Sequence, residues 1–180
     1  NGLKWALRTA EMLRGYDVHW FEEALRPDAL DDHIELRRQS PVPIAGGECL
    51  TRRQAFMPWL HGRALDIVQP DATKVGGISE QRRIAWLAND LGIQYIGHGW
   101  NTAIGVAADL QLATVFPTCD LVEYIGGSPY VDLITEGGFK LDGEGYLEIP
   151  ARPGLGVALD RGALRRYAPH ADRMFDPKAA

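Results

Sequence analysis

The sequence predicts an α/β fold in which repeated strand–helix units form part of a TIM-type (β/α) barrel. Short apolar segments alternate with helical patterns along residues 1–130. A titratable residue follows each apolar segment, and these residues recur at intervals of 23 to 27 positions: Glu22, Glu48, Asp71, His98 and Glu123. One strand, one helix and two loops need about that length. A barrel of such units gathers its strand ends, and therefore these side chains, on one face.

The helices are predicted from apolar residues that recur every three or four positions, as a helix with one buried face requires. In the first helix, over residues 3–14, this face consists of Leu3, Ala6, Leu7, Ala10 and Leu13. The other expected helices cover residues 29–39, 52–62, 80–91 and 102–115. Thr51 and Ser79 directly precede two of these helices, and we expect both residues to be N-caps.

The strands are predicted from short, mostly apolar segments between the helices, a pattern typical of a buried parallel sheet. They cover residues 18–21, 42–46, 66–69, 93–97 and 120–124. A closed barrel has eight strands and about 250 residues. We therefore expect about five of the eight β/α units, with further barrel strands before residue 1.

The repeating pattern stops at Gly126-Gly127. Residues 139–149 predict a hairpin around a Gly-rich turn. Extended segments follow, and residues 161–180 form a polar tail that is partly helical or frayed. We expect residues 1–130 to belong to the barrel, and residues 131–180 to form a C-terminal segment that packs on the barrel or on a cap domain.

The composition excludes several classes of protein. Of the 180 residues, 46% are hydrophobic and 24% are charged, which is typical of a globular protein. No apolar run approaches 18 residues, so we expect neither a transmembrane helix nor a membrane partner. The net charge of −5, without a basic cluster, argues against a nucleic-acid partner. Cys49 and Cys119 are widely spaced, which favours reduced thiols and a cytoplasmic location.

Five motifs resemble, in order and spacing, the C-terminal barrel portion of the enolase superfamily, and most closely its mandelate-racemase-like subgroup, which includes acid-sugar dehydratases. They are WFEE (20–23), IAGGE (44–48), DIVQPDATKVGGIS (66–79), His98 after IQYIG, and LVEY (121–124). The resemblance covers about residues 1–160. It implies that N-terminal barrel strands and a cap domain belong to a longer parent chain. Ala24 departs from the pattern, because many members have Pro there.

The resemblance also implies a Mg²⁺ site with Glu22 and Glu48 as ligands. Asn1 is similar to the last residue of the family's Asp-x-Asn motif, so the remaining metal ligand would be an Asp two positions before it. Glu23 is expected to lie behind the metal ligands or in a loop.

The same resemblance makes His98 and Asp71 a catalytic dyad and Glu123 an electrophile. Trp100, Asn101 and Tyr124 border these positions and are expected either to contact a substrate or to pack.

These residue types suit proton abstraction next to a carboxylate. The α-proton is too weakly acidic for a side-chain base unless the developing charge is stabilised. Mg²⁺ provides such stabilisation as a Lewis acid and prefers carboxylate oxygens as ligands. Histidine titrates near neutrality, so His98 can take and return a proton. Because only one base is evident, we expect elimination rather than racemisation. The resemblance implies a lyase that dehydrates an aldonate or aldarate to a 2-keto-3-deoxy acid, and we expect it to act as a homo-oligomer.

Three alternatives remain open. A racemase or epimerase of an α-hydroxy acid would use the same scaffold with a second base. A phosphate-binding barrel enzyme is suggested by Gly97, Gly99 and the GGS segment 126–128. An inactive fragment is the third alternative. Taken alone, Glu22 or Glu48 is more typical of a solvated loop or a helix N-cap, and Asp71 after Pro70 is compatible with a turn.

Overall fold

The computed structural model describes residues 2–168 and 170, and these residues form two compact units. The first unit contains the residues up to His98 together with Leu112–Val122. The second contains Gly99–Gln111 and the residues from Glu123 on. Asn1, expected to end a metal-binding motif, and residues 171–180 of the expected tail lie outside the described residues. The sequence-based division at residue 130 remains a prediction.

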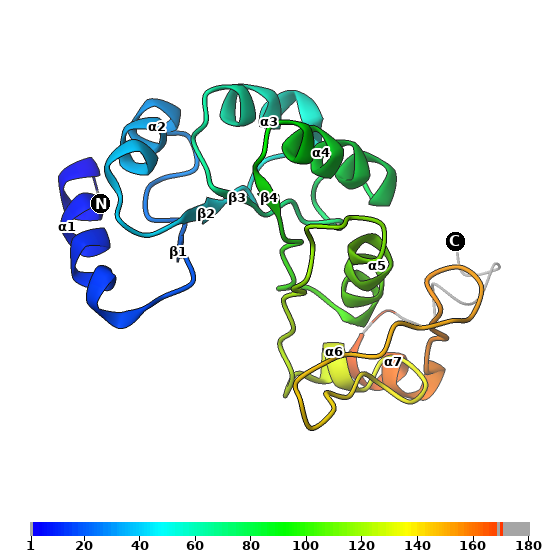
Figure 1. Cartoon of the computed structure of the whole chain (residues 1–180). Helices are drawn as coiled ribbons and strands as arrows, with labels where there is room; N and C mark the ends of the chain where they lie inside the picture. The colour runs from blue at the N-terminus through cyan, green and yellow to red at the C-terminus, as the bar shows by residue number, and fades with distance from the viewer. Residues whose placement is uncertain (1, 169, 171–180) are drawn as a thin grey trace. The chain divides into compact units, whose positions relative to one another are not determined.

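The first unit contains a parallel four-stranded sheet, as expected for part of a (β/α) barrel (Figure 1). The strands lie in the order β1-β2-β3-β4 and comprise Phe21–Glu22, Ile44–Gly46, Ile67–Val68 and Gln94–Tyr95. The register pairs Glu22 with Ala45, Ala45 with Ile67, and Ile67 with Gln94. Parallel neighbours need crossover connections. These connections contain α2 (Leu30–Gln39), α3 (Arg52–His61) and α4 (Ile78–Asp90).

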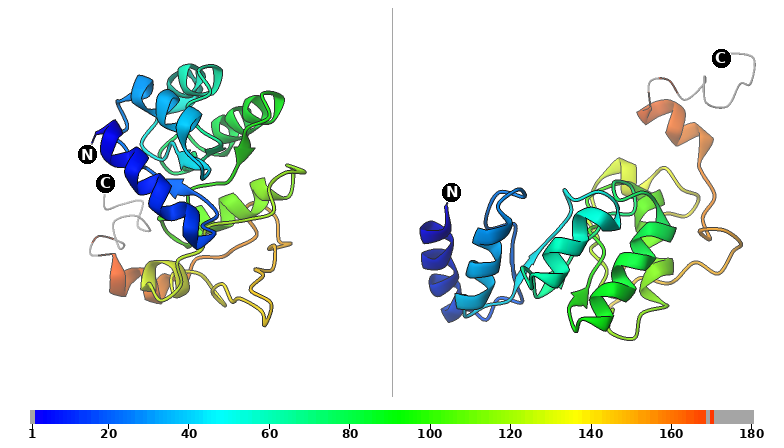
Figure 2. Two further views of the ribbon diagram at one scale, coloured as in Figure 1. Left: turned by 60° about the vertical axis from the view of Figure 1, so that its left-hand side comes forward. Right: turned by 90° about the horizontal axis from the view of Figure 1, so that it is seen from above.

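The helices of the first unit lie in chain order along one side of the sheet (Figure 2). They begin with α1 (Leu3–Leu13), which continues into the short 3-10 helix η1 (Arg14–Tyr16). The helix-facing side of the sheet contributes Ile44, Val68 and Tyr95 to the main hydrophobic core, together with Phe56 and Leu60 of α3. This burial stabilises the scaffold that carries the strand ends.

The opposite face of the sheet has a separate, smaller apolar cluster. It consists of Ala45, Ile67 and Ile96, with Trp20 packed against them. Because side chains alternate between the two faces of a strand, residues two positions further along share this face. Glu22 therefore lies on the same face as Trp20, Gln69 on that of Ile67, and His98 on that of Ile96.

Two details of the predicted elements are wrong. Residues 120–124 form no strand, so the sheet of the described chain has four strands. This segment has only Leu121 and Val122 as apolar residues ahead of Glu123, and Leu121 is exposed. Ser79 is not an N-cap, because α4 begins one residue earlier, at Ile78. Its N-cap is Gly77, whose φ of 88° a residue with a side chain rarely adopts.

The second unit contains α6 (Pro129–Asp132), α7 (Arg161–Tyr167) and most of α5 (Ala103–Ala113). The expected hairpin over 139–149 is reduced to one antiparallel bridge, between Leu141 and Leu147. Helix α7 falls within the tail expected to be partly helical, and the Asp160 carboxylate caps it by accepting a hydrogen bond from the Ala163 N–H. Among the described residues, none of the helices is long and apolar enough to span a membrane.

Candidate active site

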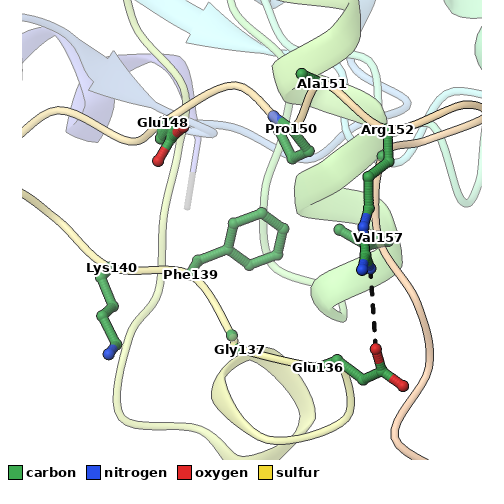
Figure 3. Close-up of a pocket in the computed structure, with 11 residues that line it drawn as sticks. Glu136, Gly137, Phe139, Lys140, Glu148, Pro150, Ala151, Arg152 and Val157 are labelled. Carbon is green, nitrogen blue, oxygen red and sulfur yellow. Dashed lines mark ion pairs between the residues drawn. The ribbon is translucent and has the colours of Figure 1, made fainter.

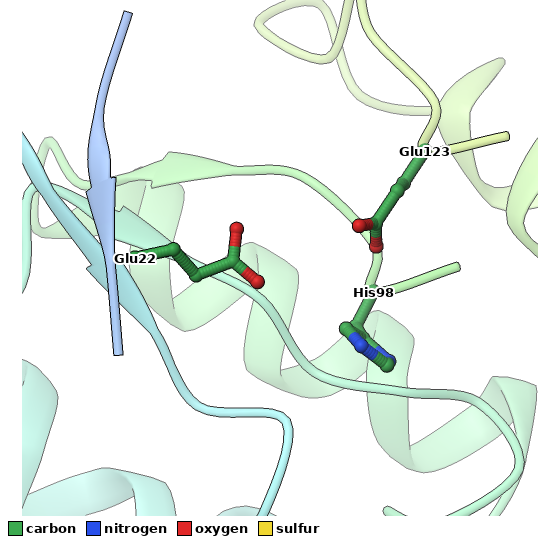
Figure 4. A group of neighbouring side chains, drawn as sticks. All are labelled: Glu22, His98 and Glu123. Carbon is green, nitrogen blue, oxygen red and sulfur yellow. The ribbon is translucent and has the colours of Figure 1, made fainter. Parts of the chain in front are cut away.

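The C-terminal ends of the four strands carry the predicted site residues of the first unit. Glu22 is the last residue of β1, and Glu48, Asp71 and His98 lie two or three residues beyond β2, β3 and β4. The structure brings Glu48, Asp71 and His98 into direct contact. Glu22 lies beside them, with a carboxylate oxygen within 4.8 Å of a His98 ring nitrogen (Figure 4). The four predicted site residues of this unit therefore form one cluster.

Asp71 and His98 form a buried hydrogen-bonded pair. His98 Nδ1 lies 2.9 Å from Asp71 Oδ2, and Asp71 is fully buried. The other carboxylate oxygen, Oδ1, accepts hydrogen bonds from the N–H and the hydroxyl of Thr73, at 2.8 and 2.6 Å. Burial alone would raise the pKa of Asp71, but the hydrogen bonds from His98 and Thr73 outweigh it and lower the pKa to about 2. Asp71 is therefore ionised and holds the imidazole through Nδ1.

Glu48 and Lys74 surround the other side of this pair. Glu48 Oε2 contacts His98 Nε2, and Lys74 Nζ lies 3.5 Å from Glu48 Oε2 and 3.6 Å from Asp71 Oδ2. The chain reaches Glu48 through Gly47, whose φ of 119° suits glycine and whose Cβ, if present, would lie 3.1 Å from the Phe56 ring. This tight turn places Glu48 next to the imidazole.

Glu22 is held by two neutral donors. The Trp20 indole N–H donates to Glu22 Oε2 at 2.8 Å, and the Gln69 side-chain amide donates to the same oxygen at 3.0 Å. Gln69 is 1% exposed. The orientation of the Glu22 carboxylate is thus fixed by one residue directly before β1 and one directly after β3.

Negative charge accumulates next to these groups. Burial raises the pKa of Glu23, and the nearby charges of Glu48 and Glu22 raise it further. Ligand atoms of Glu23, Glu48 and Cys49 lie within 4.8 Å of one another. Burial and the charges of Glu23 and Glu48 also raise the pKa of the Cys49 thiol, so it stays protonated. Several carboxylates with mutually unfavourable charge fit a hard divalent cation such as Mg²⁺ better than a thiolate-binding metal.

Glu123 belongs to the second unit, where it packs against Gly99. A carboxylate oxygen of Glu123 accepts a hydrogen bond from the Gly99 N–H. Trp100 is 73% exposed, and the Asn101 amide lies against Gly105 of α5. The Tyr124 hydroxyl is 3.1 Å from Asp132 Oδ1. Substrate contact by Trp100, Asn101 and Tyr124 remains a prediction.

The glycine-rich stretches that suggested a phosphate site have internal partners. The Gly127 N–H donates to Asp132 Oδ2 at 2.7 Å, and the Gly99 N–H donates to Glu123. Backbone N–H groups bind phosphate only when they are available to it. Carboxylates of the chain itself occupy both, so these two N–H groups are not available to an anion.

A cavity of about 390 Å³ lies within the second unit (Figure 3). Phe139 and Pro150 line it, together with Glu136 and Arg152, whose charged groups are 3.8 Å apart. Both side chains of this ion pair are more than half exposed. Exposed ion pairs contribute little to stability. Among the described residues that line this cavity, there is no buried acid–base pair comparable to Asp71 and His98.

Sequence reasoning missed three contributors to the cluster. Nothing in the sequence pattern indicates a role for Lys74, although its spacing of three residues from Asp71 is compatible with a contact inside the turn. Trp20 and Gln69 each precede a predicted site residue by two positions, and strand alternation places them on its face. This alternation of side chains was the feature of the sequence from which their position could have been predicted. Their contacts with Glu22 depend on side-chain conformations that no sequence pattern specifies.

Comparisons with known proteins find relatives over almost the whole chain. Residues 2–163 match the sequence profile of a family described as Enolase C-terminal domain-like. A D-galactarolactone cycloisomerase from Agrobacterium fabrum is 34% identical over 181 residues, which cover 96% of this chain and 46% of that protein. A D-xylonate dehydratase from Haloferax volcanii is 34% identical over 175 residues, covering 95% and 42%.

Solved structures show the same fold. A mandelate racemase/muconate lactonizing enzyme from Sulfitobacter sp. superimposes with a TM-score of 0.86 at 30% identity, covering 93% of this chain and 42% of that one. The 3,6-anhydro-D-galactonate cycloisomerase from Zobellia galactanivorans gives 0.83 at 32% identity, covering 93% and 47%. The chain spans less than half the length of these relatives.

Proposed function

Because this chain belongs to the enolase C-terminal domain-like family, we propose that the protein carrying it removes the α-proton of a sugar acid and eliminates the β-hydroxyl as water. The substrate would be an aldonate or aldarate, and the product a 2-keto-3-deoxy acid. The observation that carries this proposal is the buried Asp71–His98 pair, which lies next to the Glu22 and Glu48 carboxylates. An oriented imidazole beside metal-type ligands suits α-proton abstraction.

His98 performs both proton transfers in this mechanism. Asp71 accepts the Nδ1–H hydrogen bond, so the basic electron pair of the neutral imidazole is on Nε2. Nε2 takes the α-proton, and the ionised Asp71 stabilises the resulting imidazolium. The imidazolium then returns its proton to the departing β-hydroxyl, which leaves as water while a double bond forms between the α and β carbons. The enol product tautomerises to the 2-keto acid.

Glu22 and Glu48 are the chain's proposed ligands for Mg²⁺. When bound, this cation would stabilise the negative charge that develops on the substrate carboxylate. Glu48 lies against His98 Nε2, so the proposed ligand and the proposed base are adjacent. Glu123 is the proposed electrophile, a role that rests on the family pattern.

The test uses the natural protein that carries this sequence. It would be incubated with a library of aldonates and aldarates and Mg²⁺, with 2-keto acid detected by semicarbazide. We expect one or a few substrates to give keto acid and to lose the mass of one water. Racemisation or α-proton exchange without keto acid would reject dehydration and favour a racemase.

A cycloisomerase is the second candidate, because relatives at 34% and 32% identity carry that name. In such a reaction His98 would again take an α-proton, but the bond that breaks next would join the β-carbon to a ring oxygen. The leaving group would then remain part of the same molecule. Product and substrate would then have equal mass. Mass spectrometry of the products from lactone or anhydro-sugar acids therefore distinguishes the two candidates.

A further inference from the structure

We propose that Gln69 and Trp20 are positioning residues that set the orientation of Glu22 for cation binding. This inference rests on the proposed function, because it takes Glu22 as a metal ligand. Neither residue is itself a proposed ligand or base. Their role would be to decide which oxygen of Glu22 is presented to the cation.

Both hydrogen bonds to Glu22 end on the same oxygen. Trp20 Nε1 donates to Oε2 at 2.8 Å and Gln69 Nε2 donates to it at 3.0 Å. Among the described residues, no donor contacts Oε1 of Glu22. A carboxylate fixed through one oxygen presents the other in a defined direction, and such partners orient metal ligands and tune their affinity.

The two donors directly adjoin strands of the sheet. The backbone N–H of Gln69 donates to the Gly46 carbonyl at 2.8 Å and so extends the pairing of β2 and β3. The Gln69 side chain then reaches across β2 to Glu22 on β1, over the face of β2 on which the small side chain of Ala45 lies. Trp20 packs on the apolar face that includes Ala45. Neither donor can follow Glu22 into another rotamer without disturbing this packing.

The Gln69 carbonyl oxygen shows that the amide is oriented for Glu22. Gln69 Oε1 is buried and has no hydrogen-bond partner among the described residues. A buried acceptor without a donor is unfavourable, and such groups in native proteins call for a specific explanation. Here the explanation is that the amide N–H is held on Glu22 even though the opposite end of the side chain has no partner.

The test measures cation affinity in the natural protein that carries this sequence. Gln69→Leu removes one donor at similar size, and Trp20→Phe removes the other while keeping a packed ring. Gln94→Leu is the matched control, because Gln94 lies on the same face of the sheet but at the N-terminal end of β4, where it lines a separate cavity. Mn²⁺ binding would be measured by electron paramagnetic resonance, together with the Tm of the cation-free protein.

We expect Gln69→Leu and Trp20→Phe each to weaken Mn²⁺ binding by about 10- to 100-fold, the usual effect of losing such a partner. The double variant should bind more weakly than either, and kcat at saturating cation should fall less than the affinity. Gln94→Leu should keep the wild-type Kd. If Gln69→Leu does not fold, the Kd of Trp20→Phe for Mn²⁺ alone decides whether the positioning role holds.

Glu22→Gln separates this inference from the proposed function. Lost binding in Glu22→Gln, with unchanged Kd in Gln69→Leu and Trp20→Phe, would overturn the positioning role and leave Glu22 a ligand. Wild-type binding in Glu22→Gln would overturn the proposed ligand and this inference with it. If Gln69→Leu and Gln94→Leu weaken Mn²⁺ binding equally, and in proportion to their loss of Tm, the effect is merely structural and the positioning role is rejected.

Discussion

Gly99 and Glu123 approach each other so closely that only glycine fits at position 99. A Cβ at this position would lie 2.2 Å from the Glu123 carbonyl oxygen and 2.9 Å from its Cβ. The Gly99 N–H meanwhile donates to the Glu123 carboxylate. The residue directly after His98 thus determines where the backbone and the side chain of Glu123 lie.

Gly99→Ala should therefore displace Glu123. The added methyl group meets backbone rather than a flexible side-chain end, and overpacking of this kind costs about 1–3 kcal/mol of stability. We expect a lower Tm and a reduced kcat/KM. Gly143→Ala is the control, because a Cβ at Gly143 would meet no atom within 4 Å. A Gly99→Ala protein with wild-type Tm and kcat/KM would contradict the close approach.

His98→Asn should remove α-proton exchange. Loss of a general base typically lowers the rate by about 10²- to 10⁴-fold. The measurement is incorporation of deuterium from D₂O into a substrate, followed by NMR. His61→Asn is a suitable control, since His61 is an exposed residue in the last turn of α3. Exchange at the wild-type rate in His98→Asn would place the base elsewhere.

Asp71 should make stability depend on pH in the acidic range. Its pKa in the folded protein is about 2, below the ordinary value of 3.8, so the ionised form is stabilised by folding. This contribution is present above about pH 4 and is lost as the pH falls toward 2; it amounts to about 2 kcal/mol.

The comparison is between wild type and Asp71→Asn, with the free energy of unfolding measured in urea at pH 6 and pH 3. Asp71→Asn should be less stable at pH 6, and the difference should shrink at pH 3. Asp28→Asn provides the control, because Asp28 forms an exposed ion pair with Arg26. If the free energies of unfolding of wild type and Asp71→Asn differ by the same amount at both pH values, the ionisation of Asp71 is not the cause of the pH dependence.

Removal of divalent cations should abolish activity. The natural protein treated with EDTA is expected to lose turnover and to recover it on addition of Mg²⁺, because the substrate charge is otherwise unstabilised. Glu48→Gln should stay inactive after the same addition. Full activity in the presence of chelator would refute the metal site.

Lys74→Met tests whether Lys74 is a second base. Its ammonium group is 3.5 to 3.6 Å from Glu48 and Asp71, and its side chain is 41% exposed. We therefore expect its charge to have only a small effect on turnover. We expect kcat to fall by no more than a few-fold in Lys74→Met. Lys140→Met is the control. Loss of exchange at one face of the substrate only would instead identify Lys74 as a base and favour a racemase.

Much of the fold follows from local patterns in the sequence. Helices α1 to α5 and strands β2 to β4 lie within the predicted segments or differ from them by a few residues, because apolar periodicity reports directly on burial. The strand expected at 120–124 was wrong because two apolar residues do not supply a pairing partner. The N-cap at Ser79 was wrong because the backbone of Gly77 allows the helix to begin earlier.

The candidate site was less accessible to sequence reasoning. The positions of Asp71 and His98 after neighbouring strands indicated that the two would lie close together, since parallel strand ends share one edge of the sheet. The contacts of Lys74 and Gln69 depend on which rotamers fit around a turn and across a strand. Such choices are made by three-dimensional packing, and one sequence alone does not record them.

The alternation of side chains across the sheet also separates positions that affect folding from positions that affect substrate preference. Ile44 and Val68 face the helices, and changes there should reduce the amount of folded protein whatever the substrate. Trp20, Ile67 and Ile96 lie on the opposite face, the face that also carries Glu22 and His98. A saturation library along these strands should therefore give fitness effects with a period of two. New substrate preferences would be selected most readily at every second position, while the intervening positions stay fixed.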